Sequence, residues 1–329
     1  MIERDIAVVI VTYKCAALTI ACLDSIRAER ESFEWPIRVV VVDNASGDLE
    51  QIQQAVARNG WSWVTLVAAP KNGGFAYGNN IGIERAYAQG QPAFIHLLNP
   101  DTEVRPGGIA ALVRFLESHP EAGIAGSSFE TASGEEWPFA FRFPTLFSEL
   151  DRGLHVGLVT RCLSRWIVAK SMAPVAQPTD WVSGASMMIR SEVLASIGTL
   201  DENFFLYFEE TEFCHRARKA GYFTWYVPSS RVMHMIGQST QLDDASRLRK
   251  PLPSYWFESR RRYFVATRGT GYAAWADVIA LASGVLGLVK QSMLRRPGTP
   301  RFLRDLLKHS ALLPKNRPFA PLRCYFPPR

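Results

Sequence analysis

Three short apolar runs, each followed by polar residues, constrain the fold of this chain more than any other feature. Residues 6–11 and 39–42 consist largely of Val and Ile, and residues 93–98 form a third run of similar length. Runs of this kind are typical of strands that are buried on both faces of a sheet. The polar residues that follow the three runs are Thr12 and Tyr13, Asp43 and Asn44, and Asn99 and Asp101.

Segments with helical spacing separate these runs. Apolar residues recur at near-helical intervals in residues 18–27, 79–89 and 109–118, and residues 64–68 predict a further strand. Strands that alternate with helices indicate βαβ units, so we expect an α/β fold with a mostly parallel sheet flanked by helices. Because ligands bind such sheets at the carboxyl ends of the strands, the three polar pairs should lie together at the binding edge.

The second half of the chain is less regular at first. Residues 127–178 show no clear period and predict an insertion or loop region. The later predicted elements are a strand at 181–189 and helices at 191–197, 210–220, 255–268 and 273–290. The last helix contains an apolar run at 278–289 that extends to about seventeen residues only by including Asp277. Because a membrane span needs roughly 20 residues, we expect a packed or interfacial helix.

The charge of the chain is unevenly distributed. From Arg247 onward there are 17 Lys and Arg against 3 Asp and Glu, whereas residues 1–246 hold 20 against 28. This basic C-terminal part is expected to be either a solvated tail or an attachment surface for anionic lipid or a lipid diphosphate. No nucleic-acid-binding motif accompanies the charge, so nucleic acid is not an expected partner.

Cysteine usage and the N-terminus indicate the compartment. The five cysteines are scattered and include no CxxC pair, so neither a disulfide framework nor a structural zinc site is predicted. Glu3 and Asp5 precede an apolar run of six residues, whereas a signal peptide has a basic start and a longer apolar core. A reducing cytoplasm is therefore the expected location.

Two common nucleotide-binding templates do not fit the first strand–helix junction. Residues 11–18 contain no glycine, which excludes both GxGxxG and GxxxxGK[ST] at this point. Glycines occur instead at residues 72–80, in the segment NGGFAYGNN. They permit a tight turn that leads into a helix N-terminus, where a diphosphate could bind, although a plain turn is equally compatible with the segment.

Candidate chemistry lies after the strands and in one acidic segment. Asp101 follows a buried strand, and a hard divalent cation that takes its carboxylate would also tolerate a histidine such as His234. Residues 200–212 (LDENFFLYFEETE) place acids behind an aromatic run and before a helix. Such acids suit the helix dipole, but aromatic surroundings can also raise a carboxyl pKa toward general-base chemistry. Glu212 can pair with Arg216 four residues later and is expected to be structural.

In this order the motifs resemble those of the family 2 glycosyltransferases with the GT-A fold, and more closely their bacterial rhamnosyltransferase-like branch. The matching segments cover roughly residues 6–240 and are VTY (11–13), VVDNAS (41–46), NGGF (72–75), GNN (78–80), LNPD (98–101), WVSGA (181–185), the acidic block to Glu212 with AG (220–221), and His234 with Gly237 and Ser239. The resemblance implies a GT-A nucleotide-sugar-binding and catalytic domain at residues 1–240. Residues 241–329 would be a basic helical extension that is a candidate for membrane association.

The resemblance also implies roles for individual residues. Those at the nucleotide-sugar donor would be Thr12, Tyr13, Asp43, Asn72, Gly73, Asn99 and Asp101. The sugar and acceptor pocket would be shaped by Trp181, Gly184 and Glu209. Asp101 and His234 would hold a divalent metal ion, Mg²⁺ or Mn²⁺, and Glu210 occupies the position of the catalytic base.

Two positions depart from the wider family pattern. Asn99 replaces the first acid of the metal motif, as in the rhamnosyltransferase-like branch, and lowers the local charge by one. Glu210 stands where the family has Asp, which lengthens the side chain by one methylene. These departures leave open a protein that binds a nucleotide sugar without catalysis. A nucleotidyltransferase is a third class, although the chain lacks a glycine-rich, basic N-terminal loop.

The reaction implied by the resemblance is an inverting transfer to an acceptor hydroxyl by a single displacement. Glu210 would remove the acceptor proton while the metal neutralises charge on the leaving diphosphate. The first choice of donor is dTDP-rhamnose, with UDP-hexoses and UDP-N-acetylhexosamines as alternatives. The expected acceptor is a glycan or lipid-linked glycan of the cell envelope, reached at the inner face of the cytoplasmic membrane.

Overall fold

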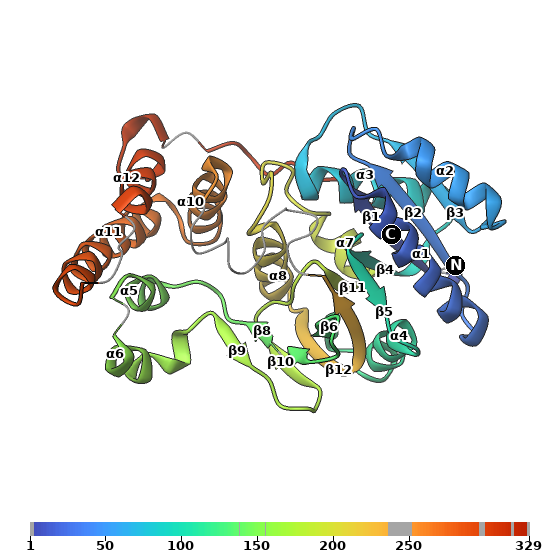
Figure 1. The fold of residues 1–329 in the computed structure, drawn as a ribbon, viewed down its shortest axis with the longest axis horizontal. Coiled ribbons are helices and arrows are strands. Elements are labelled where there is room, and N and C mark those ends of the chain that lie inside the picture. Colours follow the sequence, from blue (N-terminus) through green and yellow to red (C-terminus); the bar gives the residue numbers. More distant parts are fainter. Residues whose placement is uncertain are drawn as a thin grey trace.

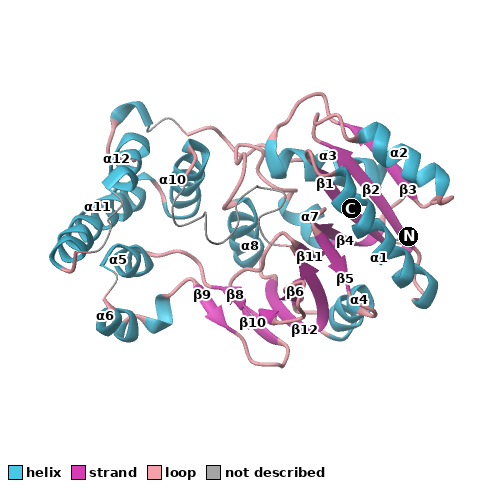
Figure 2. Cartoon of the chain, viewed as in Figure 1, coloured by secondary structure: helices cyan, strands magenta, loops and turns pink. Residues whose placement is uncertain are grey.

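A ten-stranded mixed sheet forms the centre of the protein, and helices cover both of its faces (Figure 2). The computed structural model describes residues 3–137, 139–154, 156–235, 252–295, 300–316 and 319–327. The main path of the sheet is β10-β12-β6-β11-β4-β1-β2-β3, while β5 pairs with β12 and β7 pairs with β6. The strands are β1 (Glu3–Thr12), β2 (Ile37–Asp43), β3 (Val64–Ala68), β4 (Pro92–Leu98), β5 (Thr102–Val104), β6 (Ala122–Glu130), β7 (Glu136–Trp137), β10 (Gln177–Thr179), β11 (Ser186–Arg190) and β12 (Phe223–His234).

The expected α/β architecture is confirmed. Strands β1, β2, β3 and β4 are parallel to their neighbours within this group, and β6 is parallel to β12. The antiparallel strand β11 lies between β4 and β6 and joins these two parallel groups. The sheet register sets Thr12 opposite Asp43 and Ile10 opposite Leu98, so the three polar pairs do follow neighbouring strand ends.

Side-chain alternation divides the core into two halves. On β1, Ile6, Val8 and Ile10 belong to one buried cluster, whereas Ala7 and Val9 belong to the other. The first face is covered by α1 (Ala16–Ser32), α2 (Leu49–Arg58) and α4 (Gly108–Ser118). The second face is covered by α3 (Gly74–Ala88), α7 (Ser191–Ile197) and α8 (Glu209–Lys219). Burial on both faces explains why these strands read as unbroken apolar runs.

Some expected elements differ from those observed. The helix expected at residues 79–89 already begins at Gly74, and α2 has no counterpart among the expected elements. The strand expected at 181–189 begins only at Ser186, because a turn in which the Ser186 N–H donates to the Ser183 carbonyl precedes it. The stretch 127–178 contains the end of β6, the strands β7 and β10, and the short elements β8 (Phe139–Phe141), α5 (Leu146–Leu154), α6 (Gly157–Cys162), η1 (Ser164–Trp166) and β9 (Ala169–Ser171).

The C-terminal helices pack against part of this insertion at the end of the molecule away from β2 and β3 (Figure 1). They are α10 (Ser254–Arg268), α11 (Thr270–Met293) and α12 (Pro300–His309), and the short η2 (Pro314–Asn316) follows them. The buried Arg260 of α10 pairs with Glu149 of α5 and with Asp277 of α11. Because an uncompensated buried charge is costly, this network fixes the three helices to one another.

Helix α11 is longer than the sequence indicated. It spans 24 residues, and its most apolar 18-residue window has a mean hydropathy of 1.7, so it is long and apolar enough to cross a bilayer. The expectation that it falls short of that length was wrong, because the helix continues through Asp277, whose charge is paired with Arg260. Only 33% of that window is buried against the rest of the protein. The helix therefore packs, as expected, but with one side only.

The chain then returns from the helical end to the sheet domain. The Thr199 N–H donates to the Tyr325 carbonyl, and the Glu202 N–H donates to the Arg323 carbonyl, each at 2.8 Å. Residues 319–327 therefore lie along the loop that leads into α8, and the C-terminal part of the chain contacts the sheet domain far from α11.

Candidate active site

A cavity of about 580 Å³ opens at the carboxyl ends of the parallel strands. It collects residues from the loops after β1, β2 and β4, from the glycine turn before α3, and from the start of α8. Of the residues singled out in the sequence, those that line the cavity are Tyr13, Asn72, Asn99, Asp101, Gly184, Glu209, Glu210 and His234. Residues separated by more than 200 positions in the sequence thus share one pocket.

Asp101 and His234 meet on one side of this cavity. The Nε2 atom of His234 lies 3.4 Å from Oδ1 of Asp101. The pairing arises because β5, which begins directly after Asp101, runs antiparallel to β12 and sets Thr102 opposite His234. Asn99, which precedes them by two residues at the end of β4, lines the same cavity. Carboxylate, imidazole and amide oxygen together form a donor set suited to a hard divalent cation.

Glu209 and Glu210 lie at the N-terminus of α8, on the other side of the pocket. The helix is preceded by Tyr207 and Phe208, whose φ angles of 72° and 69° are in the left-handed region that such residues rarely adopt. This strained turn lets the chain begin the helix with both carboxyl groups next to the cavity. Glu212, one turn further on, forms the expected ion pair with Arg216 at 2.8 Å.

Burial changes the acidity of the two carboxyl groups. It raises the pKa of Glu210 to about 7. Burial, and then the charge of Glu210, raise the pKa of Glu209 well above its ordinary range. One oxygen of each group, Oε2, is shielded from solvent and has no hydrogen-bond partner among the described residues. A carboxyl group that titrates near neutral pH is suited to accept a proton from a substrate.

The glycine turn packs directly against the aromatic segment before α8. Gly74 has φ +88°, and a Cβ atom there would lie 1.9 Å from the Phe205 carbonyl oxygen. The Phe75 N–H donates to this same carbonyl at 2.8 Å. A Cβ on Gly184 would lie 3.0 Å from the ring of Phe75 and 3.9 Å from Cβ of Glu210. The absence of side chains at both positions therefore keeps the turn, the ring and the carboxyl group close together.

Four of the singled-out residues do not line the cavity. Thr12 is fully buried, and its hydroxyl bonds to Asp48 and Thr19. Asp43 accepts hydrogen bonds from the Ser46 hydroxyl and backbone and thereby closes the turn after β2. Gly73 contributes its N–H to the Asn44 side chain. The half-buried indole of Trp181 stacks on Phe141, with ring centroids 4.2 Å apart, and donates to the Arg142 carbonyl.

Other residues reach the cavity that were not among the site candidates. Asn44 lines it and donates to the Asn72 side chain and the Gly74 carbonyl, so it ties the end of β2 to the glycine turn. Tyr255 comes from α10, and its ring lies 5.2 Å from that of Phe205. Asn44 could have been recognised from its place in the polar pair, whereas nothing in the sequence around Tyr255 indicates this position.

The cavity thus combines a carboxyl group that titrates near neutral pH with a donor set for a divalent cation. The sequence profile of the family described as "Glycosyltransferase like family 2" matches residues 4–251. The chain belongs to glycosyltransferase family 2. Gly237 and Ser239, which complete the last motif, lie outside the described residues.

Similar proteins include rhamnosyltransferases. The glycosyltransferase is 31% identical over 226 residues to the N-acetylglucosaminyl-diphospho-decaprenol L-rhamnosyltransferase of Mycobacterium tuberculosis, covering 65% of this chain and 72% of that protein. It is 25% identical over 238 residues to the dTDP-rhamnosyl transferase RfbF of Shigella flexneri, covering 72% and 71% of the two chains. These relatives support the resemblance to the rhamnosyltransferase-like branch.

The fold of the glycosyltransferase is also that of solved GT-A enzymes. A mannosyltransferase from Pyrobaculum calidifontis, solved with GDP-Man and Mn²⁺, superposes with a TM-score of 0.51 over 96% of this chain and 83% of that chain. The two sequences are 16% identical, so this likeness concerns the fold alone.

Proposed function

We propose that the enzyme transfers rhamnose from dTDP-rhamnose to an acceptor hydroxyl with inversion at the anomeric carbon. The single observation that carries the proposed reaction type is that Glu210, with its pKa near neutral, lines the same cavity as Asp101 and His234. A base and an anion-stabilising centre in one pocket are what a direct displacement of a nucleoside diphosphate requires.

Glu210 is the proton acceptor in the proposed reaction. Its carboxylate takes the proton of the acceptor hydroxyl while that oxygen forms a bond to the anomeric carbon. The bond between the anomeric carbon and the diphosphate oxygen breaks on the opposite face, and the nucleoside diphosphate leaves with the bonding pair. One displacement of this kind inverts the configuration. Glu209 is buried beside Glu210, and burial together with the charge of Glu210 raises the pKa of Glu209, so Glu209 keeps its proton when Glu210 is ionised.

Asp101 and His234, with Asn99 beside them, are the proposed ligands of Mg²⁺ or Mn²⁺. Within the described ranges no three His, Cys, Asp or Glu side chains converge on one point. The remaining ligands would therefore be oxygens of the donor diphosphate and water. When bound, the cation supplies positive charge that stabilises the leaving diphosphate. The chain's own contribution is to hold the carboxylate and the imidazole 3.4 Å apart at the strand ends.

The donor is proposed from the names of the relatives, among which are an L-rhamnosyltransferase and a dTDP-rhamnosyl transferase. The test is a binding and hydrolysis screen of the full chain against UDP-, dTDP- and GDP-sugars, with Mg²⁺, with Mn²⁺ and with EDTA. A metal-dependent preference for dTDP-rhamnose is the expected result. Preference for a UDP-sugar would change the proposed donor from dTDP-rhamnose to that sugar nucleotide. The proposed reaction, an inverting glycosyl transfer, would be unaffected. Binding without turnover across several acceptors would instead favour a non-catalytic protein.

The proposed acceptor is a lipid-linked glycan that the enzyme reaches as a peripheral protein at an anionic membrane surface. Helix α11 exposes an apolar face whose large side chains are Trp275, Val278, Val285, Leu286, Val289 and Met293. The exposed basic residues Arg295, Arg301 and Arg304 follow this face in the chain. An exposed apolar helix face, followed in the chain by basic residues, is suited to the interface of an anionic bilayer.

The membrane proposal is tested by changing the exposed face without shortening the chain. Removal of residues 269–329 would also take Asp277 from Arg260, so it would disturb the fold. Leu286→Glu with Val289→Glu is expected to reduce co-sedimentation with anionic vesicles. The same two charges at Ala132 and Ser133, in an exposed loop far from α11 in the sequence, are the control. Equal sedimentation of the wild type and the α11 variant would contradict the proposal.

A further inference from the structure

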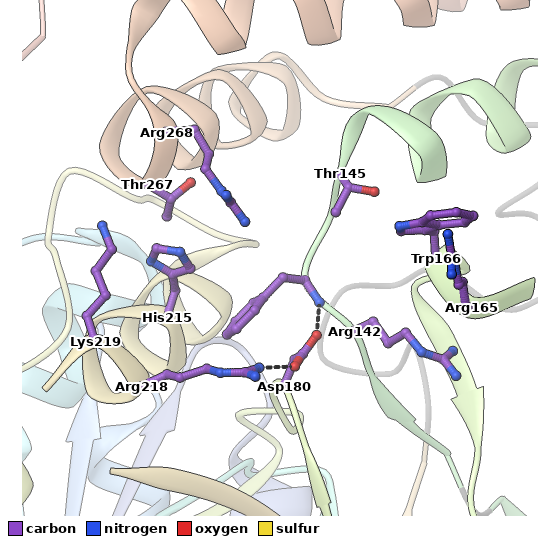
Figure 3. A pocket seen from close by; sticks show the side chains of 11 residues that line it. Arg142, Thr145, Arg165, Trp166, Asp180, His215, Arg218, Lys219, Thr267 and Arg268 are labelled. Carbon is purple, nitrogen blue, oxygen red and sulfur yellow. Dashed lines mark hydrogen bonds and ion pairs between the residues drawn. The ribbon is translucent and has the colours of Figure 1, made fainter. Parts of the chain in front are cut away.

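A second cavity, of about 630 Å³, shares none of its lining residues with the active-site pocket. Its walls come from the C-terminal half of α8, the end of α10, and the insertion around residues 142–145, 165–166 and 180 (Figure 3). Nothing in the proposed reaction uses this cavity.

Positive charge dominates the second cavity. Five cationic side chains line it, namely Arg142, Arg165, Arg218, Lys219 and Arg268. The single carboxylate in the lining is Asp180, and both of its oxygens are engaged, one by the Phe143 N–H and the other by Arg218. Among the described residues, the other four cations have no carboxylate within ion-pair distance. Like charges gathered around a hollow without counter-charges repel one another, and an anion in the hollow would relieve that repulsion.

The cationic groups are partly fixed in place. The Arg142 guanidinium donates to the Ile167 carbonyl at 3.0 Å, and Arg165 stacks over Trp166 with its central carbon 3.8 Å from the ring centroid. Arg218 is held by Asp180 on the opposite side (Figure 3). Such anchoring lowers the conformational entropy lost when a ligand binds. Planar guanidinium groups match the geometry of phosphate oxygens.

His215 also lines the cavity, among these cations. Burial, followed by the charges of Lys219, Arg268 and Arg218, lowers the pKa of His215 to about 4. His215 is therefore neutral at pH 7 while surrounded by cations.

Helix α8 contributes lining residues to both cavities. Glu210 is at its first turn and Arg218 is near its last, eight residues later. At 1.5 Å per residue the two positions are roughly 12 Å apart along the helix axis. That separation is of the order of one sugar residue plus a phosphate group when both side chains extend toward the ligand.

We infer that the second cavity binds the diphosphate that links the acceptor sugar to its lipid. This inference rests on the proposed function, because it takes the acceptor hydroxyl to be at Glu210. The diphosphate would enter among Arg142, Arg218 and Arg268 while the sugar reaches the start of α8. The cavity would then select acceptors that carry a diphosphate and would set which hydroxyl faces the base.

Pyrophosphate binding tests the site without requiring turnover. Inorganic pyrophosphate is titrated calorimetrically into the full chain in EDTA, with saturating dTDP to occupy the donor pocket. Arg218→Gln with Arg268→Gln is expected to weaken binding at least tenfold, because charge-assisted hydrogen bonds are lost. Arg58→Gln with Arg85→Gln removes the same charge from exposed helix positions outside the cavity and should leave the affinity unchanged. Absence of pyrophosphate binding to the wild type, or equal loss in both variants, would overturn the inference.

Two further measurements identify the source of the diphosphate. With a short-chain N-acetylglucosaminyl diphosphate lipid as acceptor, the KM for this acceptor should be at least tenfold higher in the cavity variant than in the wild type. The KM for the donor should be the same in both. With an alkyl N-acetylglucosaminide that lacks phosphate, wild type and variant should have the same KM. If the cavity variant instead loses binding to anionic phospholipid vesicles and keeps pyrophosphate affinity, the cavity serves lipid headgroups and the inference is wrong. If no donor is turned over, the proposed function fails while the pyrophosphate titration still decides the site.

Discussion

The imidazole of His234 lies 3.4 Å from the carboxylate of Asp101, although 133 positions separate the two residues in the chain. The antiparallel register of β5 and β12 brings them together, with Thr102 opposite His234. This pair is the part of the active-site cavity that is best suited to a divalent cation. It also makes the metal proposal testable at a single residue.

Asp101→Asn keeps the volume of the side chain and removes its charge. We expect the affinity for Mn²⁺ in the presence of dTDP to fall at least tenfold, because the anionic ligand is lost. The measurement is a Mn²⁺ titration followed by electron paramagnetic resonance. Glu103→Gln, two residues further along and outside the cavity lining, is the matched control. Unchanged Mn²⁺ affinity in Asp101→Asn would exclude this residue as a ligand.

Glu210→Gln removes the proposed base and retains its shape. The kcat of transfer is expected to fall by about 10²–10⁴-fold, which is the usual contribution of general-base catalysis. The affinity for the donor, measured by calorimetry, should change little because the amide fills the same space. Turnover equal to that of the wild type would rule out Glu210 as the base.

The pH dependence of the reaction follows from the same carboxyl group. The base must be ionised, and its pKa is raised to about 7 by burial. The value of kcat/KM for the wild type should therefore rise about tenfold per pH unit below pH 7 and level off above it. A profile measured from pH 5.5 to 8.5 checks this. A flat profile across pH 7 would show that another group, or none, limits the rate.

The raised pKa also predicts an effect on stability that does not depend on activity. In the folded chain Glu210 holds its proton up to about pH 7, whereas its ordinary pKa is 4.5. The folded state therefore binds more protons between these values, and the free energy of unfolding falls as pH rises through this window. The Glu210→Gln variant has no ionisable group at this position, so its free energy of unfolding should not fall for this reason as pH rises. Its Tm should exceed that of the wild type by roughly 2 °C or more at pH 8 and match it near pH 4.5.

Gly74→Ala tests the contact between the glycine turn and the aromatic segment. A Cβ atom there would collide with the Phe205 carbonyl oxygen, and φ is +88°. We expect a loss of about 2–4 kcal/mol in the free energy of unfolding, from overpacking and backbone strain together. Gly60→Ala is the control, because Gly60 has φ +64° but open space around it, and it should cost about 1 kcal/mol. Equal losses in urea unfolding would show that the contact with Phe205 is unimportant.

The sequence by itself determined the layered α/β fold and the edge at which the site lies. Apolar runs such as residues 6–11 are long enough for strands and too uniform for one-sided burial, so they require helices on both faces. The polar residues after them then fall at the strand ends, whatever the details of packing. The order of the short motifs also indicated the family, and most of these motifs lie where a strand or helix begins or ends.

Only the tertiary structure decided which polar residues face the cavity. Asp43 and Asn44 are neighbours in the sequence, yet the Asp43 carboxylate closes its own turn while Asn44 reaches the glycine turn some 30 residues later. Which of the two side chains faces the cavity depends on where the glycine turn before α3 packs against the end of β2. No local sequence pattern specifies that packing. Tyr255 reaches the cavity, and five cations surround a second hollow, through contacts between segments far apart in the chain. Local sequence determines the period and ends of each element, whereas sheet register and helix packing determine which side chains meet.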